Sequence, residues 1–259
     1  MTMTPVENFI AFRTIFIKEI LRFARIWVQT IVPSIITVAL YFVIFGNLIG
    51  SQLDEVKGHS YIDYIIPGMI MMSIITNSYA NVVSSFYSSK FQKHIEEMLV
   101  SPMPNYIIIW GFLSGGIARG LTVGVAVTIT ATFFTDLQFQ NIGLLLLVAL
   151  LTCILFSLAG LINAIFANSF DDISLIPTFV LTPLTYLGGI FYSIDMLPEF
   201  WRSVSYANPI VYMVDTFRTG MIGVNDINTY LSLSIILAFV IVLYITASTL
   251  LNRGTGIRS

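Results

Sequence analysis

The sequence predicts an all-α integral membrane protein with six membrane-spanning helices. Its 259 residues are 56% hydrophobic and only 10% charged, whereas soluble domains carry roughly 25% charged residues. Between Asp136 and Asp171 the chain has no Asp, Glu, Lys or Arg, and five similar gaps divide the rest. Because about twenty apolar residues suffice for a helix to cross the hydrocarbon core, we expect repeated membrane crossing.

The gaps place the spans at residues 28–50, 64–86, 107–133, 143–166, 174–193 and 229–251. Lipid offers no hydrogen-bonding partner to bare backbone, and the ten-residue alternation of an outer-membrane barrel is missing, so helices are expected. The short connections leave no room for a second soluble domain of ordinary size. We therefore predict a single domain over residues 1–259. One cysteine, Cys153, leaves the redox compartment undetermined.

The basic residues predict the orientation. With six spans both termini share a side, and Lys57, Arg202 and Arg218 fall on the opposite side, while Arg119 lies within the third span. The shared side holds the other eight basic residues: Arg13, Lys18, Arg22, Arg25, Lys90, Lys93, Arg253 and Arg258. The positive-inside rule therefore predicts cytoplasmic termini.

Residues 7–27 precede the first span and predict an amphipathic helix in the cytoplasmic interface. Lys18, Arg22 and Arg25 share one face. The apolar side carries Phe12, Phe16, Ile20 and Phe23. The alternative is a simple topology signal without a structural role.

The segment from Lys90 to Pro104 joins spans two and three on the cytoplasmic side. Pro102 and Pro104 stop a short surface helix there. Its apolar residues at helical spacing are Phe91, Ile95, Met98 and Leu99. This helix is positioned to bind a soluble partner, and the alternative is a solvated loop helix.

Small residues and prolines shape two spans. The third span has glycines about four residues apart, which predicts close helix packing within the bundle or against a second subunit: Gly111, Gly115, Gly116, Gly120 and Gly124. The fifth span contains Pro177, Pro183, Gly188 and Gly189, which predict a kink or break.

The outer segment Ser193–Asp226 is long and rich in aromatic residues. Asn208 and Pro209 predict an N-cap and first turn, followed by an apolar stripe of Ile210, Val214, Phe217 and Met221. Leu197–Tyr206 predicts a preceding short helix bearing Phe200 and Trp201. Two half-inserted helices explain the segment, and an aromatic belt is the alternative.

Polar residues within the spans share single faces and are candidates for lining a path. Packing is the alternative, since Ser and Thr also bond within membrane helices. The stripes are Ser73, Asn77, Asn81, Ser84 and Ser88 in span two, Thr178, Thr182 and Thr185 in span five, and Thr30, Ser34, Thr37 and Tyr41 in span one.

Arg119 is the sole charge deep in a span. An intramembrane charge suggests a functional site, with Asp171 or Asp172 as conceivable partners, and a structural tie between helices is the alternative. Elsewhere no GxxxxGK[ST] motif occurs, and His59 and His94 lie on opposite sides without a ligand cluster. We expect no catalytic residue, no metal and no cofactor bound by this chain.

Five blocks carry a resemblance to a known family: KEILRFARIWVQTIVPSIIT, FVIFGNLIG, FQKHIEEMLVSPMP, FDDISLIPTFVLTPLTYLGGIFYS and NPIVYMVDTFR. The chain resembles the type-2 ABC exporter permeases and, within them, the YadH-like inner-membrane permeases of bacteria. The resemblance runs from about residue 13 to the C-terminus.

The resemblance implies a six-helix permease domain that works as a homodimer with two ATPase subunits, which bind the ATP and Mg. Glu7–Trp27 would be the connecting helix, Asp195–Met221 the paired re-entrant helices, and spans two and five the helices facing the pathway. The coupling helix would present Lys90, Lys93, His94, Glu96, Glu97, Met98 and Leu99. Drugs, lipids and polysaccharides remain open as substrates, and an ion-coupled carrier or a non-transporting scaffold are the rival functions.

Overall fold

The computed structural model describes residues 3–49 and 55–256. Within them the chain is helical, apart from loops and one isolated bridge between Val56 and His59. Gly50, which ends the first predicted span, and Arg258, which was counted for topology, lie outside the described residues. An all-helical fold is confirmed.

Five helices in the described residues are long and apolar enough to cross a membrane. The first is α2 (Trp27–Tyr41), which continues into the π-helical segment η1 (Phe42–Ile49). The others are α3 (Tyr61–Phe91), α5 (Asn105–Ala131), α6 (Ile142–Phe166) and α11 (Thr229–Arg253). They correspond to the first four predicted spans and the sixth.

The fifth predicted span is broken, as its prolines indicated. It consists of α7 (Asp172–Ile176), the π-helical segment η2 (Pro177–Leu181) and α8 (Thr182–Tyr186). The Thr182 hydroxyl donates to the Pro177 carbonyl at 2.9 Å, and the Thr182 N–H donates to the same carbonyl, which gives the wider π-helical turn. The helical part ends at Tyr186, so the predicted extent of 174–193 was too long.

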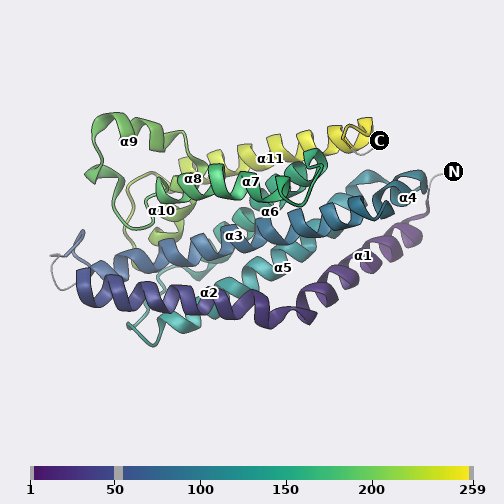
Figure 1. The fold of residues 1–259 in the computed structure, drawn as a ribbon. Coiled ribbons are helices and arrows are strands. Elements are labelled where there is room, and N and C mark those ends of the chain that lie inside the picture. Colours follow the sequence, from purple (N-terminus) through teal and green to yellow (C-terminus); the bar gives the residue numbers. More distant parts are fainter. Residues whose placement is uncertain (1–2, 50–54, 257–259) are drawn as a thin grey trace.

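Helix α3 runs through the middle of the bundle (Figure 1). It packs most extensively on α5 and α6 and also contacts α10 (Pro209–Ile222). The helix α1 (Pro5–Arg25) is set at an angle to α2 and packs on α5. Both termini and α4 (His94–Val100) lie at one end, which we call the terminal end. The helix α9 (Glu199–Tyr206) lies at the other, which we call the α9 end.

The glycines of α5 pack within the bundle, as predicted. A Cβ at Gly111 would lie 2.6 Å from Ile15 of α1, and one at Gly124 would lie 2.8 Å from Ile74 of α3. These distances are shorter than real Cβ contacts, so only glycine permits the observed approach. Gly115, Gly116 and Gly120 likewise face Glu19, Ser157 and Ser78.

The predicted N-cap and apolar stripe of α10 are also confirmed. The Asn208 side chain accepts from the Ile210 N–H at 3.0 Å and donates to the Leu184 carbonyl at 2.6 Å, which ties α10 to α8. The stripe Ile210, Val214, Phe217 and Met221 is buried, whereas Phe200 and Trp201 of α9 are exposed.

Candidate coupling and pathway sites

The helix α4 is anchored on one side and exposed on the other. Lys93 precedes it with a φ of +63°, a left-handed conformation that turns the chain sharply out of α3. Ile95 is fully buried, while His94 and Glu97 are exposed and Glu96 is half-buried. Met98 and Leu99 pack against the core. A partner could therefore reach one charged face of a helix that is held firmly by the other face.

Lys90 is half-buried beside this surface. It lies in the last turn of α3, and its ammonium donates to the carbonyls of Ile165 and Ala167 at 2.6 and 2.7 Å. These carbonyls belong to the last turn and the C-cap of α6, where a helix leaves acceptors unpaired. The Lys90 side chain therefore caps α6 in the described structure, and its contact with a partner stays a prediction. The predicted helix over Lys90–Pro104 was too long.

The charged residues of α1 contact the bundle rather than forming a separate polar face. Lys18 donates to Ser89 at 3.3 Å, and Arg22 donates to the backbone and side-chain oxygens of Asn81 at 2.9 and 2.8 Å. The fully buried Glu19 lies between them, accepting from Ser85 at 2.6 Å and pairing with Arg22 at 3.3 Å. Arg13 and Arg25 are exposed, and within the described residues neither forms a hydrogen bond or an ion pair through its side chain.

The polar face of α3 differs in part from the predicted stripe. Ser73, Asn77 and Asn81 are buried, and the stripe continues through Ser85 and Ser89, which contact α1. Ser84 and Ser88 are half-buried on a neighbouring face with Thr76 and Ala80. In the single chain Asn77 and Asn81 connect α3 to neighbouring helices, whereas Ser73 lines the cleft between α2 and α3. That these residues line a path stays a prediction.

Arg119 contacts α3 and not the loop that carries Asp171 and Asp172. Its Nε and Nη2 donate to Asn77 Oδ1 at 3.2 and 3.1 Å. Asn77 in turn donates to Ser34 of α2 at 3.2 Å. The Asp172 carboxylate accepts instead from its own loop, at the N–H groups of Asn168 and Ser169. The proposed aspartate partners were therefore wrong.

The three threonines of the broken helix are divided. Thr178 and Thr182 are exposed, whereas Thr185 is buried and donates to the Leu181 carbonyl at 2.7 Å. Thr178 and Thr182 present hydroxyl groups to the exterior, and the Thr182 hydroxyl donates a hydrogen bond to the Pro177 carbonyl. Thr185 therefore does not line an open path.

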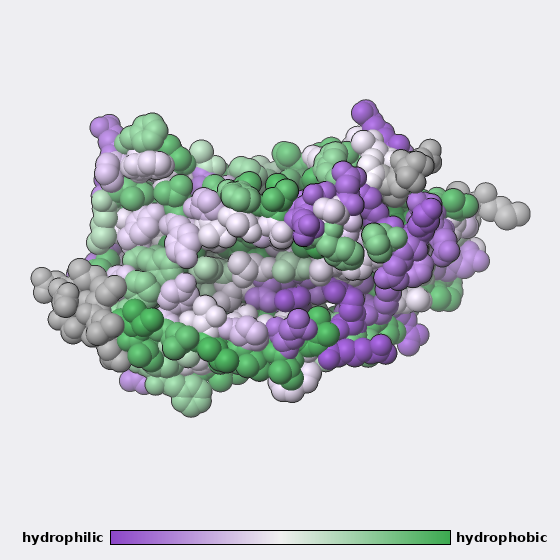
Figure 2. All heavy atoms as spheres, in the orientation of Figure 1, coloured by the Kyte–Doolittle hydropathy of each residue, from purple (hydrophilic) through white to green (hydrophobic). Residues whose placement is uncertain are grey.

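A cleft separates α2 from α3. A cavity of about 210 Å³ in it is lined by hydroxyl groups and by methionine side chains, among them Ser34, Thr37, Ser73, Thr76 and Met72. Figure 2 shows this face of the molecule, with weakly polar and hydrophilic residues between two hydrophobic bands that lie over α2 and over α7 and α8. The hydrophilic atoms become denser toward the terminal end.

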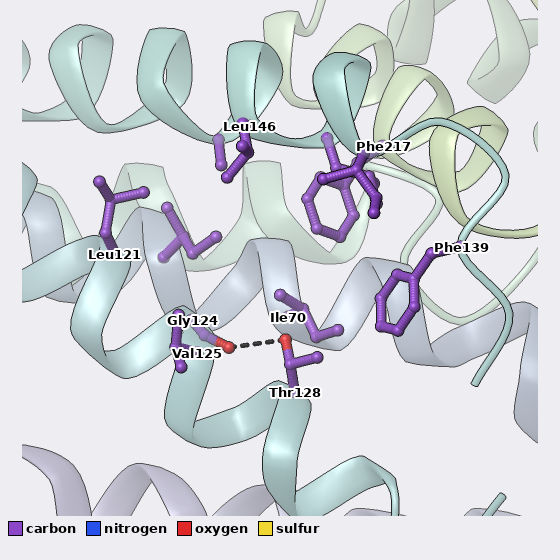
Figure 3. A pocket seen from close by; sticks show the side chains of 12 residues that line it. Ile70, Leu121, Gly124, Val125, Thr128, Phe139, Leu146 and Phe217 are labelled. Carbon is purple, nitrogen blue, oxygen red and sulfur yellow. Dashed lines mark hydrogen bonds between the residues drawn. The ribbon is translucent and has the colours of Figure 1, made fainter. Parts of the chain in front are cut away.

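A second cavity of about 290 Å³ lies between α3, α5, α6 and α10 (Figure 3). Its lining includes Leu121, Leu146 and Phe217, and the one hydroxyl group there, on Thr128, donates to the Gly124 carbonyl at 2.8 Å. This cavity is suited to an apolar hydrocarbon group, because its lining has no free polar group that could bind a polar ligand.

The α9 end contains a buried arginine, Arg218, which was predicted only as a basic residue on the outer side. Arg218 is 2% exposed and donates to the carbonyls of Tyr64 and Gly189 at 3.2 and 2.7 Å. Its guanidinium also lies 3.9 Å from the centre of the Tyr64 ring. The i+4 and i+7 spacing from the buried Val214 and Val211 was the available signal that Arg218 faces inward.

Lys57 joins the loop before α3 to the segments around α9 and α10. It pairs with Asp226 and, at 3.3 Å, with Asp195. Burial alone would lower the pKa of the Lys57 ammonium, but the hydrogen bond and charge of Asp226 outweigh it, so the pKa is raised. Among the described residues no group of His, Cys, Asp and Glu is arranged to hold a metal ion.

Comparison with known proteins agrees with this architecture. The family described as "ABC-2 type transporter" matches residues 10–222. The chain is 54% identical over 250 residues to the inner membrane transport permease YadH of Escherichia coli (strain K12), covering 96% of this chain and 98% of that protein. It is 22% identical over 237 residues to nodulation protein J of Rhizobium leguminosarum bv. viciae, covering 91% and 92%. The chain therefore belongs to the ABC-2 type transporter family, as a transmembrane permease subunit.

Proposed function

We propose that two copies of this chain form one export path, driven by two separate ABC ATPase subunits that bind ATP and Mg. The whole chain, residues 1–259, would act as a single transmembrane domain in a bacterial inner membrane. Relatives named as an inner membrane transport permease support this location. The two copies would face each other across the surface between α2 and α7–α8, where Phe179 and Leu40 expose apolar side chains.

The proposed topology has six crossings and cytoplasmic termini. The segment α7–η2–α8 has 15 residues in helical conformation (172–186), which gives a length of roughly 22 Å at 1.5 Å per residue. A hydrocarbon core is about 30 Å thick, so this crossing needs a cover at one end. The helices α9 and α10 follow directly and would supply it as a re-entrant pair on the outer side.

The anchoring of α4 is the observation that carries the proposal. Ile95 is 0% exposed. The helix is joined to α3 through residues 92–93 and to α5 through residues 101–104, both of which are short connections. A push on α4 would therefore be transmitted to α3 and α5 rather than absorbed by a loop. The exposed His94, Glu97 and Val100 form the face that a groove of the ATPase would bind.

The test is to purify the chain with its co-expressed ATPase after Glu96→Ala plus Glu97→Ala. We expect loss of co-purification, or ATP hydrolysis in proteoliposomes reduced about tenfold, because two charges would be removed from the docking face. Asp136→Ala plus Glu199→Ala is the matched control, since both acids are exposed at the α9 end. Unchanged assembly and unchanged hydrolysis in the Glu96 and Glu97 variant would exclude the assigned role of α4.

A partner whose ATPase is inactivated separates this function from its rivals. An ATP-driven permease loses export in that background, whereas an ion-coupled carrier keeps it. A scaffold without transport activity would show no export with either partner.

A further inference from the structure

The seam between α1, α3 and α5 contains more positive than negative charge. Lys18, Arg22 and Arg119 each donate to a neutral side chain of α3, at Ser89, Asn81 and Asn77 respectively. Among the described residues Glu19 is the one carboxylate that forms an ion pair with any of these three cations. Three cations and one anion leave an excess of two positive charges.

The two guanidinium groups also retain unused donors. Arg119 directs its Nε and Nη2 to a single oxygen of Asn77, and Arg22 uses its Nε on Glu19 and its Nη2 on Asn81. In the described structure Nη1 of neither arginine has a hydrogen-bond partner within the protein. Asn77 and Asn81 are one helical turn apart, so the two groups lie close together along α3.

These arginines adjoin the cleft between α2 and α3. Ser34 lines the cavity of about 210 Å³, and its hydroxyl oxygen accepts from Asn77, whose other side-chain atom holds Arg119. Arg22 and Arg119 are both partly exposed. The cavity itself combines hydroxyl groups with the apolar side chains of Met69, Met72 and Val38.

We infer that this cleft binds an amphiphile with an anionic, phosphate-type head group. The head would be held by Arg22 and Arg119, and the hydrocarbon chain would lie along the cavity between α2 and α3. Guanidinium groups bind phosphate oxygens through paired, charge-assisted hydrogen bonds. An anion there would also offset the excess charge, which is costly within a bilayer. The inference rests on the proposed export function and assigns its substrate class.

The binding test uses the full chain alone in phosphatidylcholine nanodiscs, without ATPase. Dodecyl phosphate with a diazirine in its tail is photolysed, and labelled peptides of α2 and α3 are quantified by mass spectrometry. Probes with the same tail and a trimethylammonium or maltoside head are compared. We expect at least tenfold more labelling from the phosphate probe. Because no ATPase is present, failure of coupling through α4 would not affect this result.

Two variants are expected to change the labelling in opposite directions. Arg119→Gln should reduce it about tenfold, the effect of losing one charge-assisted hydrogen bond. Glu19→Gln keeps the shape of a side chain that accepts from Ser85 but removes the competing negative charge, so it should raise labelling about threefold. A purely structural network would instead lose labelling in both variants.

Arg119→Lys retains the charge, and its labelling should stay within about threefold of the wild type. This variant shows whether the loss in Arg119→Gln comes from the missing charge or from misfolding. Arg25→Gln is the matched control, because Arg25 is exposed one turn from Arg22 on the same helix. The inference is overturned if the three probes label equally, if Arg25→Gln lowers labelling as much as Arg119→Gln, or if Glu19→Gln lowers it. If equimolar inorganic phosphate displaces the probe, the site binds a free anion, and the proposal that it binds an amphiphile is overturned.

Discussion

The α9 end and the middle of the bundle hold arginine among the helices in different ways. At the α9 end Arg218 is almost fully buried, donates to two backbone carbonyls and lies over the Tyr64 ring. In the middle of α5, Arg119 is half-buried and donates only to the side-chain oxygen of Asn77. One turn away, Arg22 donates to the Asn81 side-chain oxygen, but also to the Asn81 carbonyl and to the Glu19 carboxylate.

The difference separates a structural from a functional charge. Backbone carbonyls cannot move without moving their helices, so Arg218 fixes α10 and the loop at Gly189 to α3. Amide side chains can rotate, and the guanidinium groups they hold keep spare donors. Removing a fully buried charge partner is expected to affect stability, whereas changing a half-exposed one is expected to affect binding.

The largest effect on stability is expected from Arg218→Gln. The variant loses the guanidinium that joins Tyr64 and Gly189 and should lower the free energy of unfolding by about 3 kcal/mol. Thermal unfolding in nanodiscs measures the change. Arg202→Gln is the control, since Arg202 is only partly buried on the exposed α9 and should cost less than about 1 kcal/mol. If both variants lose the same free energy of unfolding, Arg218 has no greater structural role than Arg202.

Gly68→Ala tests the same end by overpacking. A Cβ there would lie 2.7 Å from the Ile190 carbonyl oxygen, which is backbone and cannot rotate away. We expect a loss of about 2 kcal/mol, typical of an added methyl group in a packed core. Gly143→Ala provides the comparison, because its Cβ would meet no atom nearer than 3.5 Å. A Gly68 variant as stable as the Gly143 variant would contradict the close packing.

Asn77→Leu tests the seam. The variant removes the acceptor of Arg119 and the donor to Ser34. Because Arg119 can still reach water or head groups, stability should fall by only about 1 kcal/mol. ATP hydrolysis by the assembled complex should fall several-fold with assembly intact. Thr122→Val is a suitable control, as its exposed hydroxyl bonds within α5. If the Asn77→Leu complex hydrolyses ATP at the wild-type rate, the polar stripe of α3 serves helix packing only.

The smallest effect is expected from Asp172→Asn. Hydrogen bonds from Asn168 and Ser169 hold the pKa of the Asp172 carboxyl below its usual value. Its contribution to the loop is therefore present above about pH 4 and is lost as the pH falls through the lowered folded-state pKa. Labelling by dodecyl phosphate should not change. A large decrease in labelling would indicate that Asp172 interacts with Arg119 after all.

Hydropathy and local chemistry predicted much of the fold. Charge-free gaps predicted five of the long helices because burial in lipid excludes charge over a whole span. The Asn208 cap and the glycines of α5 were predictable, since each depends on the conformation or size of one residue. The extent of the broken helix was not, because Pro177 and Pro183 signal a break without determining how the chain continues.

The site was less predictable, because it depends on which helices meet. Span two has a serine at positions 84 and 88 and again at 85 and 89, so periodicity alone does not select the buried face. The partner of Arg119 lies 42 residues away on α3, and no local pattern indicates that pairing. The burial of Arg218 was not predicted, because counting basic residues assigns a side of the membrane and does not address burial.

The most direct measurement compares Arg119→Gln with Arg218→Gln in one set of nanodiscs, recording the melting temperature and dodecyl phosphate labelling per folded molecule. For Arg119→Gln we expect a melting temperature close to the wild type with about tenfold less labelling. For Arg218→Gln we expect a clearly lower melting temperature with normal labelling of the molecules that remain folded. The account is contradicted if the two variants lose stability and labelling together, or if their effects are reversed.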